Sequence, residues 1–326
     1  MFLRKTALIL IVLTLGLTGC ALAAPSSPAS LTPVSLPLGY VPNVQFAPLY
    51  VAMEKGYFKD AGIDLTLDYS FETDAMALVG ANKLQFAMVS GEQVLLARAQ
   101  ALPVVYISAW YQDFPVGIVS LTSAGITSPA DLKGKSIGVP VLSGASYIGL
   151  RALLSAGGLE EKDVNIQVVG FNQVEALVSG QVDAAVVYVA NEPVQLKARG
   201  YDIQVLRVAD YMELVSNGLV TNETTLAANP ALAAALAAAI QKGIVYTAAH
   251  PEEAYEISKQ YVENLAQADA ATQQAVLAES IGMWQIEKPG YTSPASWQNM
   301  ADVLTGMGML PNASGLEQAY TNQFSQ

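Results

Sequence analysis

The sequence predicts an α/β fold of two lobes, each a mostly parallel sheet flanked by helices. Its 326 residues are enough for about two domains. Strand-like runs alternate with helix-like runs from residue 34 to residue 109, and the alternation starts again after residue 121, which favours parallel strands joined by crossover helices. Only helix-like segments follow residue 229. Helices without a sheet of their own must pack on an existing lobe.

The first lobe is expected to open with a strand over 34–39. Residues 47–55 (APLYVAMEK) have apolar residues at helical spacing, and residues 63–69 (IDLTLDY) alternate as a half-buried strand does. Ser90 and Gln93 have the spacing of a capping box, in which both side chains bond the backbone at a helix start. The remaining elements are expected to be a helix over 75–81, a strand over 84–89, a helix over 94–99 and a strand over 104–109.

The second lobe repeats this order. Ser128-Pro-Ala-Asp131 combines an N-cap, a proline at the first helical position and an acid in the first turn. Strands are expected over 136–141, 164–169, 184–188 and 203–208, with helices over 147–156 and 173–179, and the C-terminal helices over 230–248, 251–265, 272–281 and 294–304.

The economical arrangement is that the C-terminal helices complete the first lobe. Lobe 1 is then discontinuous, with residues 34–120 and 219–326, and lobe 2 spans 121–218. The chain passes between the lobes near 119–122 and again near 217–221, which predicts a two-strand hinge.

The N-terminus has the pattern of a secretory signal. Arg4 and Lys5 precede an uncharged apolar run over 7–17, which is shorter than the roughly 20 residues that span a membrane. The run ends in Leu17-Thr-Gly-Cys20, which is similar to a bacterial lipobox. We therefore expect a signal peptide over 1–19, a lipidated Cys20 followed by a flexible Ser- and Pro-containing tether to residue 33, and an extracytoplasmic protein anchored to the membrane surface.

Composition excludes several classes of function. The formal net charge of −12 argues against nucleic-acid binding. One Cys and one His leave no basis for Cys/His zinc sites, His-based triads or a disulfide framework. No metal, cofactor or catalytic residue is expected.

Three stretches together carry a family resemblance. They are 39–65 (with GYVPN, APLYVA, EKGYFK and AGIDL), 128–138 (SPADLKGKSIG) and 177–185 (LVSGQVDAA). In this order they resemble the substrate-binding proteins of bacterial ABC importers for sulfonates, thiamine pyrimidine precursors and riboflavin. The resemblance implies a type II periplasmic-binding-protein fold, a ligand held in the cleft between the lobes, and a permease as partner. We expect a monomer.

The same family includes a eukaryotic pyrimidine-making enzyme with a Cys-rich motif and an active His. This chain has no Cys after Cys20, and its single His250 precedes a proline at an expected helix start. The enzymatic activity is therefore not expected.

Ligands of two-lobe α/β proteins lie at the carboxyl ends of strands and at helix N-termini. Loops at such positions supply the candidate binding residues: Tyr40, Asn43, Gln45, Phe71, Ser90, Glu92, Gln93, Trp110, Tyr111, Ser143, Ser146, Tyr147, Tyr188, Asn191 and Glu192.

These loops contain aromatic, amide and carboxylate side chains but no Arg or Lys, which favours a planar heterocycle over a sulfonate or phosphate. The pyrimidine binders of the family usually have a Trp and an acid where this chain has Gly39-Tyr40. The 15 tyrosines suit a larger ring system, and the chain most resembles the riboflavin-binding members of the family. The resemblance implies riboflavin as the ligand, with a thiamine pyrimidine precursor or a sulfonate as alternatives. Tyr40, Trp110 and Tyr188 are expected to stack on the ring, although Trp110 and Tyr188 could equally be core residues.

A different class remains open. A secreted enzyme could use a carboxylate pair drawn from Glu72, Asp113 and Glu192, but the sequence contains no G-x-S-x-G, H-E-x-x-H or glycine-rich phosphate loop. A sensor or adhesion module on the membrane surface could share the fold.

Overall fold

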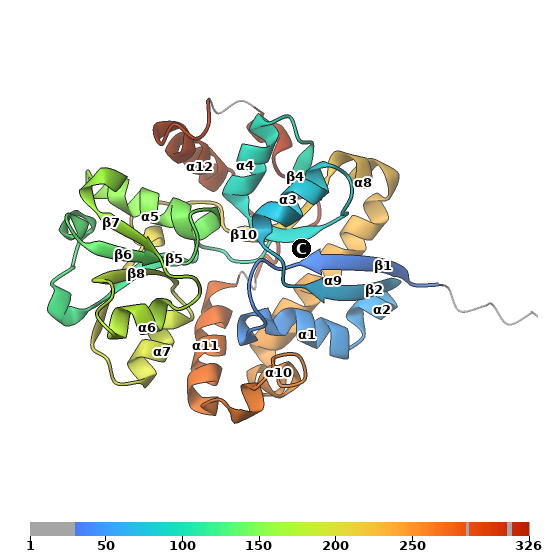
Figure 1. The fold of residues 1–326 in the computed structure, drawn as a ribbon. Coiled ribbons are helices and arrows are strands. Elements are labelled where there is room, and N and C mark those ends of the chain that lie inside the picture. The colour runs from blue at the N-terminus through green and yellow to red at the C-terminus, as the bar shows by residue number, and fades with distance from the viewer. Residues whose placement is uncertain (1–29, 285–286, 312–314, 326) are drawn as a thin grey trace, which may run out of the picture. The chain divides into compact units, whose positions relative to one another are not determined.

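The computed structural model describes residues 30–284, 287–311 and 315–325, and residues 31–326 form one compact unit. The expected signal peptide, Cys20 and most of the expected tether lie outside these ranges. Within them, strands and helices alternate along the chain up to strand β10, and helices follow it (Figure 1). The prediction of an α/β fold is confirmed.

The first group of strands forms two small sheets. Strand β1 (Thr32–Pro37) pairs in parallel with β2 (Ile63–Asp68). Strand β10 (Asn217–Asn222) lies between β3 (Ala87–Ser90) and β4 (Val104–Ala109) and is antiparallel to both.

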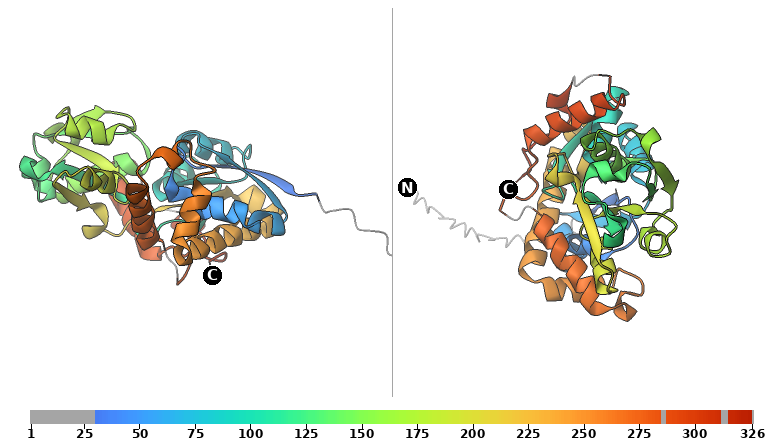
Figure 2. Two further views of the ribbon diagram at one scale, coloured as in Figure 1. Left: turned by 90° about the horizontal axis from the view of Figure 1, so that it is seen from below. Right: turned by 90° about the vertical axis from the view of Figure 1, so that its left-hand side faces the viewer.

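Helices from both ends of the chain pack on these strands. Those of the N-terminal part are α1 (Ala47–Glu54), α2 (Tyr57–Asp60), α3 (Glu72–Gly80) and α4 (Gly91–Ala99). Those of the C-terminal part are α8 (Glu223–Ala228), α9 (Pro230–Ala249), α10 (Pro251–Ser258), α11 (Ala270–Met283) and α12 (Pro294–Gly306). Helices α9 and α10 lie against α1 (Figure 2), and α12 lies against α4.

The second group is one sheet of five strands in the order β7-β6-β8-β5-β9. These strands are β5 (Val116–Leu121), β6 (Ser136–Val139), β7 (Asn165–Val168), β8 (Ala184–Tyr188) and β9 (Ile203–Arg207). Helices α5 (Gly144–Ala156), α6 (Gln173–Val178) and α7 (Glu192–Ala198) connect them.

The two strands that carry the chain between the groups were expected only as hinge connections. Strand β5 follows β4 into the five-stranded sheet, and β10 follows β9 back to the first group. Each is antiparallel to both of its neighbours, whereas β6, β7 and β8 are mutually parallel. The sheet of β3, β10 and β4 therefore contains antiparallel pairs instead of the mostly parallel pairing expected, and the five-stranded sheet is mixed. The reason is that a strand that arrives from the other group enters in the opposite direction to the strands that follow crossover helices.

Helix α9 illustrates how the C-terminal part joins the core. Asn229 caps it, since its Oδ1 accepts from the backbone N–H of Leu232 at 3.1 Å. A Cβ on Gly243 would lie 2.2 Å from the carbonyl oxygen of Pro48, so only glycine allows this approach of α9 to α1. By length and composition α9 could cross a membrane, but the face that includes Leu236 and Ile240 is buried against the protein.

Some expected elements differ in their limits. Strand β1 begins at Thr32, two residues earlier than expected, and α10 ends at Ser258, well before the expected residue 265. Helix α7 was not expected at all, because Pro193 interrupts the helical pattern at its start. The proline is tolerated there since the first helical residues have no intrahelical partner for their N–H groups.

Candidate functional site: a cavity between two walls

A cavity with a volume of about 100 Å³ lies between the two groups of strands. Its first wall consists of residues from the first group and its second wall of residues from the five-stranded sheet and its helices. Of the candidate residues, these line the cavity: Tyr40, Gln45, Phe71, Gln93, Trp110, Tyr111, Ser143, Ser146, Tyr188, Asn191 and Glu192.

Four candidates do not line it. Asn43 caps the 3₁₀ turn that follows it, where its Oδ1 accepts from the N–H of Gln45 at 3.0 Å. Tyr147 points to the protein surface and bonds Glu161, which is also paired with Arg151. The other two, Ser90 and Glu92, are fully buried behind the first wall. Asn43 and Tyr147 therefore make local contacts, while Ser90 bonds both Glu92 and a residue that lines the cavity.

That residue is Glu72, at the start of α3. Its Oε2 accepts from the hydroxyl of Ser90 at 2.8 Å, from the N–H of Ser90 at 3.3 Å and from Nε2 of Gln93 at 2.7 Å. Its Oε1 accepts from Nδ2 of Asn217 at 3.0 Å. The expected capping box at Ser90 and Gln93 is wrong, because both side chains bond this carboxylate instead of the helix backbone.

Two glycines with positive φ make room for Glu72. A Cβ on Gly39 (φ 73°) would lie 2.3 Å from Cγ of Glu72. A Cβ on Gly144 (φ 65°) would lie 3.3 Å from Oε2 of Glu72, which shows how close the first turn of α5 comes to the carboxylate. Burial raises the pKa of Glu72. The N-terminus of α5, which favours negative charge, opposes this from the opposite wall.

In the second wall, Tyr188 lies at the end of strand β8, and Asn191 and Glu192 lie at the start of helix α7. The backbone N–H of Tyr188 donates to Oε2 of Glu192 at 3.0 Å. Asn191 donates to Oε1 of Glu192 at 3.3 Å, and its own Oδ1 accepts from Gln195 at 2.8 Å. Burial raises the pKa of Glu192 to about 7, so this acid is close to half-protonated at neutral pH.

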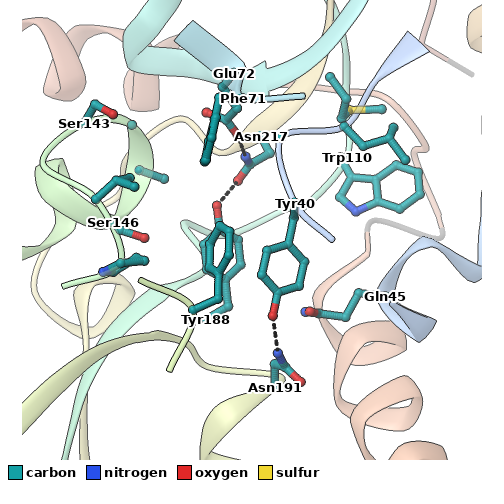
Figure 3. A pocket seen from close by; sticks show the side chains of 18 of the residues that line it. Tyr40, Gln45, Phe71, Glu72, Trp110, Ser143, Ser146, Tyr188, Asn191 and Asn217 are labelled. Atoms are coloured by element: carbon teal, nitrogen blue, oxygen red, sulfur yellow. Dashed lines mark hydrogen bonds between the residues drawn. The ribbon is translucent and has the colours of Figure 1, made fainter. Parts of the chain in front are cut away.

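Three contacts join the two walls. The hydroxyl of Tyr188 donates to Oδ1 of Asn217 at 3.3 Å, and Nδ2 of Asn191 donates to the hydroxyl of Tyr40 at 3.3 Å (Figure 3). The rings of Tyr40 and Phe171 meet edge to face with centroids 4.9 Å apart. The cavity is therefore narrow, and a ring system that enters it must separate some of these pairs.

Trp110 differs from the other two aromatic residues of the expected clamp. It is only 3% exposed. Its ring contacts Phe46, Tyr111 and Trp284 at centroid distances of 5.8 to 6.5 Å. Trp110 thus presents only a part of its ring to the cavity, whereas Tyr40 and Tyr188 are half-buried and lie nearer its centre in Figure 3.

The cavity carries acids without bases. Glu72 and Glu192 line it, and no Lys, Arg or His does so among the residues that the structure describes. In the same residues no group of three or more His, Cys, Asp or Glu is placed to hold a metal ion. Such a lining suits a neutral ligand that offers N–H and O–H donors to carboxyl and amide oxygens and a flat face to tyrosines.

The most important residue outside the fifteen candidates is Asn217, the first residue of β10. A rule based on the carboxyl ends of strands does not select Asn217, because it starts its own strand. Strand β10 is antiparallel to β3, so Asn217 lies opposite Ser90, at the carboxyl end of β3. The signal in the sequence was a polar residue at the point where the chain returns to the first group of strands. Glu72, Phe46 and Phe171 also line the cavity and lie in or beside the loops considered from sequence.

Comparison with solved structures defines the class of fold. The alkanesulfonate-binding protein SsuA from Xanthomonas axonopodis pv. citri, bound to MOPS, superposes with a TM-score of 0.70 at 15% identity, over 90% of this chain and 99% of that one. The chain therefore has the two-lobe periplasmic-binding-protein fold, as expected.

Sequence comparison defines the family. Residues 43–254 match the model of the family described as NMT1/THI5 like. This chain belongs to that family.

Two relatives are named as binding proteins. The riboflavin-binding protein RibY from Chloroflexus aurantiacus is 37% identical, over 96% of this chain and 97% of its own. The formylaminopyrimidine-binding protein from Halalkalibacterium halodurans is 28% identical, over 96% and 97%. A relative from Legionella pneumophila, 27% identical over 69% of this chain and 72% of its own, is named as 4-amino-5-hydroxymethyl-2-methylpyrimidine phosphate synthase.

Proposed function

We propose that this chain is the extracytoplasmic solute-binding protein of an ABC uptake transporter, and that it captures riboflavin in the cavity between its walls. The observation that carries the proposal is the 37% identity to a riboflavin-binding protein over nearly the whole of both chains. The cavity lining supports it, since tyrosines can face the flat ring while Glu72, Asn217 and Asn191 can bond its polar edge and hydroxylated arm.

The direct test is to purify the mature protein, release any bound small molecule and identify it. Riboflavin would give a yellow preparation with flavin absorbance bands. Titration calorimetry would then compare riboflavin, formylaminopyrimidine and an alkanesulfonate on the ligand-free protein. Tight binding of riboflavin alone supports the proposal; a preference for either of the other two ligands contradicts it.

A pyrimidine precursor of thiamine is the second candidate ligand, because a formylaminopyrimidine-binding protein is among the relatives. Its smaller ring would fit the narrow cavity with less separation of the walls. The Gly39-Tyr40 sequence argues against it, because it lacks the Trp and acid usual in pyrimidine binders.

The same proposal covers location and partners. Lipidation of Cys20 would anchor the protein outside the cytoplasm, next to a permease that receives the ligand from a monomeric binding protein. Acyl chains contribute about 0.8 kcal/mol per buried CH₂, so loss of the lipid removes the anchor. Cys20→Ala is expected to release a folded, ligand-binding protein from the membrane fraction, and retention after a salt wash would contradict the anchor.

The proposed function is binding without catalysis. Two relatives that match 96% of the chain are named as binding proteins, while the synthase from Legionella pneumophila matches 69% of it. The test is to incubate the protein with its ligand and look for a changed product by mass spectrometry; recovery of unchanged ligand is expected.

A further inference from the structure

Glu92 is a buried acid that the proposed ligand contacts do not use. Its side chain lies on α4 behind the first wall and is fully buried. One carboxyl oxygen, Oε1, shares a short hydrogen bond with Oγ of Ser90, and Oε2 has no hydrogen-bond partner among the described residues. A buried carboxylate with so few donors would be costly, which makes its protonation state informative.

The hydrogen-bond donors divide unequally between the two acids. Glu72 accepts from the hydroxyl and N–H of Ser90, from Gln93 and from Asn217. Among the side chains that the structure describes, Glu92 bonds the hydroxyl of Ser90 alone. Burial raises the pKa of both acids, but four donors oppose this at Glu72 and fewer do so at Glu92, so of the pair Glu72 takes the negative charge and Glu92 the proton.

The Ser90 hydroxyl completes this argument. Its oxygen lies within hydrogen-bond distance of both acids, but a hydroxyl has a single proton to donate. When that proton points to Glu72, the short contact with Glu92 is a hydrogen bond only if Glu92 is the donor. The arrangement then runs in one direction, from Glu92 through Ser90 to Glu72.

We propose that Glu92 is a positioning residue of the binding site: as a neutral acid it donates to Oγ of Ser90, commits the Ser90 hydroxyl to Glu72, and so holds the Glu72 carboxylate as an acceptor for an N–H or O–H group of the ligand. This inference rests on the proposed function, since riboflavin offers an imide N–H and several hydroxyls. It adds a residue outside the cavity to those that determine affinity.

The electrostatic surroundings agree with the geometry. Burial, together with the charge of Glu72, raises the pKa of Glu92 to about 8. Several titratable groups lie on the elements packed against α4, and among them the charge of Glu72 acts on the pKa of Glu92. The other titratable groups on these elements are Asp74 on α3, Tyr106 on β4, Tyr147 and Arg151 on α5, and Asp302 on α12.

The arrangement makes affinity depend on pH. If only the form with neutral Glu92 holds Glu72 in place, the apparent Kd rises as that form is depleted. One pH unit above a pKa of about 8, the competent fraction is about one in eleven, so affinity falls about tenfold between pH 7 and pH 9.

The experiment measures riboflavin Kd from pH 6.5 to 9.5 for the wild type, Glu92→Gln and Glu252→Gln. A glutamine keeps the shape and the donor of neutral Glu92 but cannot ionise. Glu252 is exposed on α10, so the same substitution there is the matched control. Glu192, which lines the cavity and whose pKa burial raises to about 7, contributes alike to all three profiles. Beyond that shared change, we expect the wild type and E252Q to lose about tenfold more affinity than E92Q between pH 7 and pH 9, while E92Q binds within threefold of the wild type at pH 7.

Ionisation of the ligand itself affects all three proteins alike and cancels in the comparison. An alkaline loss in E92Q equal to that of the wild type overturns the proposal. If E92Q does not fold, Ser90→Ala serves instead, because it disconnects Glu92 from Glu72. S90A is expected to bind riboflavin more weakly at pH 7 and to lack the loss of affinity between pH 7 and pH 9 that depends on Glu92. If S90A still shows that loss, the proposal is overturned.

A ligand-free readout separates this inference from the proposed function. If the wild type binds no riboflavin at any pH, the proposed ligand is wrong, and thermal unfolding then tests the state of Glu92. Its folded pKa is raised, so the folded protein binds more protons than the unfolded chain from about pH 4.5 to 8, and stability falls as pH rises through that window. The wild-type Tm should therefore fall relative to that of E92Q; parallel profiles overturn the inference.

Discussion

The two walls of the cavity are built in different ways. In the first wall, Glu72 is fixed by four hydrogen bonds from three residues on α4 and β strands of the same group. In the second wall, the backbone of Tyr188 and the side chain of Asn191 bond neighbours along the chain, and each side chain reaches across the cavity with one hydrogen bond. The first wall holds a hydrogen-bond acceptor, Glu72, in place before a ligand arrives. The side chains of the second wall can exchange a hydrogen bond within the protein for one to the ligand.

This difference suggests an order of events. A ligand that enters the cavity can meet Glu72 in its final position, since all four hydrogen bonds that Glu72 accepts come from residues of the first group. The second wall then closes by replacing its contacts with Asn217 and Tyr40. The predictions below test whether the first wall is the rigid partner and the second the adaptable one.

The largest loss of riboflavin affinity is expected from Gly39→Ala, which changes the first wall next to Glu72. The new Cβ would lie 2.3 Å from Cγ of Glu72, so the carboxylate must move. Overpacking of this kind costs up to about 3 kcal/mol, and riboflavin affinity should fall roughly 100-fold by calorimetry.

Gly56→Ala is the control for backbone strain. Gly56 has nearly the same φ, 76°, but nothing lies within 4 Å of the added Cβ. It should lose about 1 kcal/mol of stability and no affinity. Equal losses of affinity in the two variants would show that Gly39 matters only for its backbone.

The second effect concerns the adaptable wall. Tyr188→Ala removes an aromatic face and should weaken riboflavin binding about tenfold or more, since an aromatic contact adds about 0.5–1.5 kcal/mol beyond the area that it buries. Tyr211→Ala is the control, because Tyr211 is 44% exposed and does not line the cavity. An affinity of the Tyr188 variant within twofold of the wild type would remove it from the clamp.

A smaller effect should appear as coupling between the walls. Tyr188→Phe and Asn217→Ala both remove the hydrogen bond that joins β8 to β10. Residues in contact typically show interaction energies of about 0.5–3 kcal/mol in a double-mutant cycle, and we expect about 1 kcal/mol in ligand-free stability measured by denaturant unfolding. Additive effects would mean that the walls are not joined through this pair.

The smallest effect on affinity is expected from Trp110→Phe. Trp110 is packed among Phe46, Tyr111 and Trp284, so its main role is in the core of the first group. Riboflavin affinity should stay within threefold, while stability falls by about 1–3 kcal/mol in thermal unfolding. A large loss of affinity at unchanged Tm would restore Trp110 as a stacking residue.

Local sequence patterns predicted most of the helices and strands, because the spacing of apolar residues in a segment indicates which of its faces is buried. The alternation of 63–69 and the apolar spacing of 47–55 correspond to β2 and α1 with small shifts at their ends. Helix α7 escaped prediction because the turn of chain that starts it, Asn191-Glu192-Pro193, contains no apolar periodicity.

The residues that line the cavity could be predicted only on strands whose direction could be predicted. Tyr188 follows β8 and Tyr40 follows β1, so a rule based on carboxyl ends of strands finds them. Asn217 starts β10, and its place beside Ser90 depends on the antiparallel entry of that strand. Ser90 and Gln93 have the spacing of residues at a helix start, and the presence of Glu72 beside them depends on the packing of α3 against β3.

The sequence by itself determined the α/β class, the order of elements and the acid-rich, base-free character of the site, because periodicity and composition are local properties of the chain. Tertiary structure alone decided which acid accepts from Ser90, which tyrosine is free to meet a ligand, and which crossing residue joins the walls. These outcomes depend on residues far apart in the chain, such as Glu72 and Asn217, whose distance of 3.0 Å follows from the pairing of β10 with β3. No local pattern encodes that pairing, since its free energy comes from burial and hydrogen bonds that form only when both strands are in place.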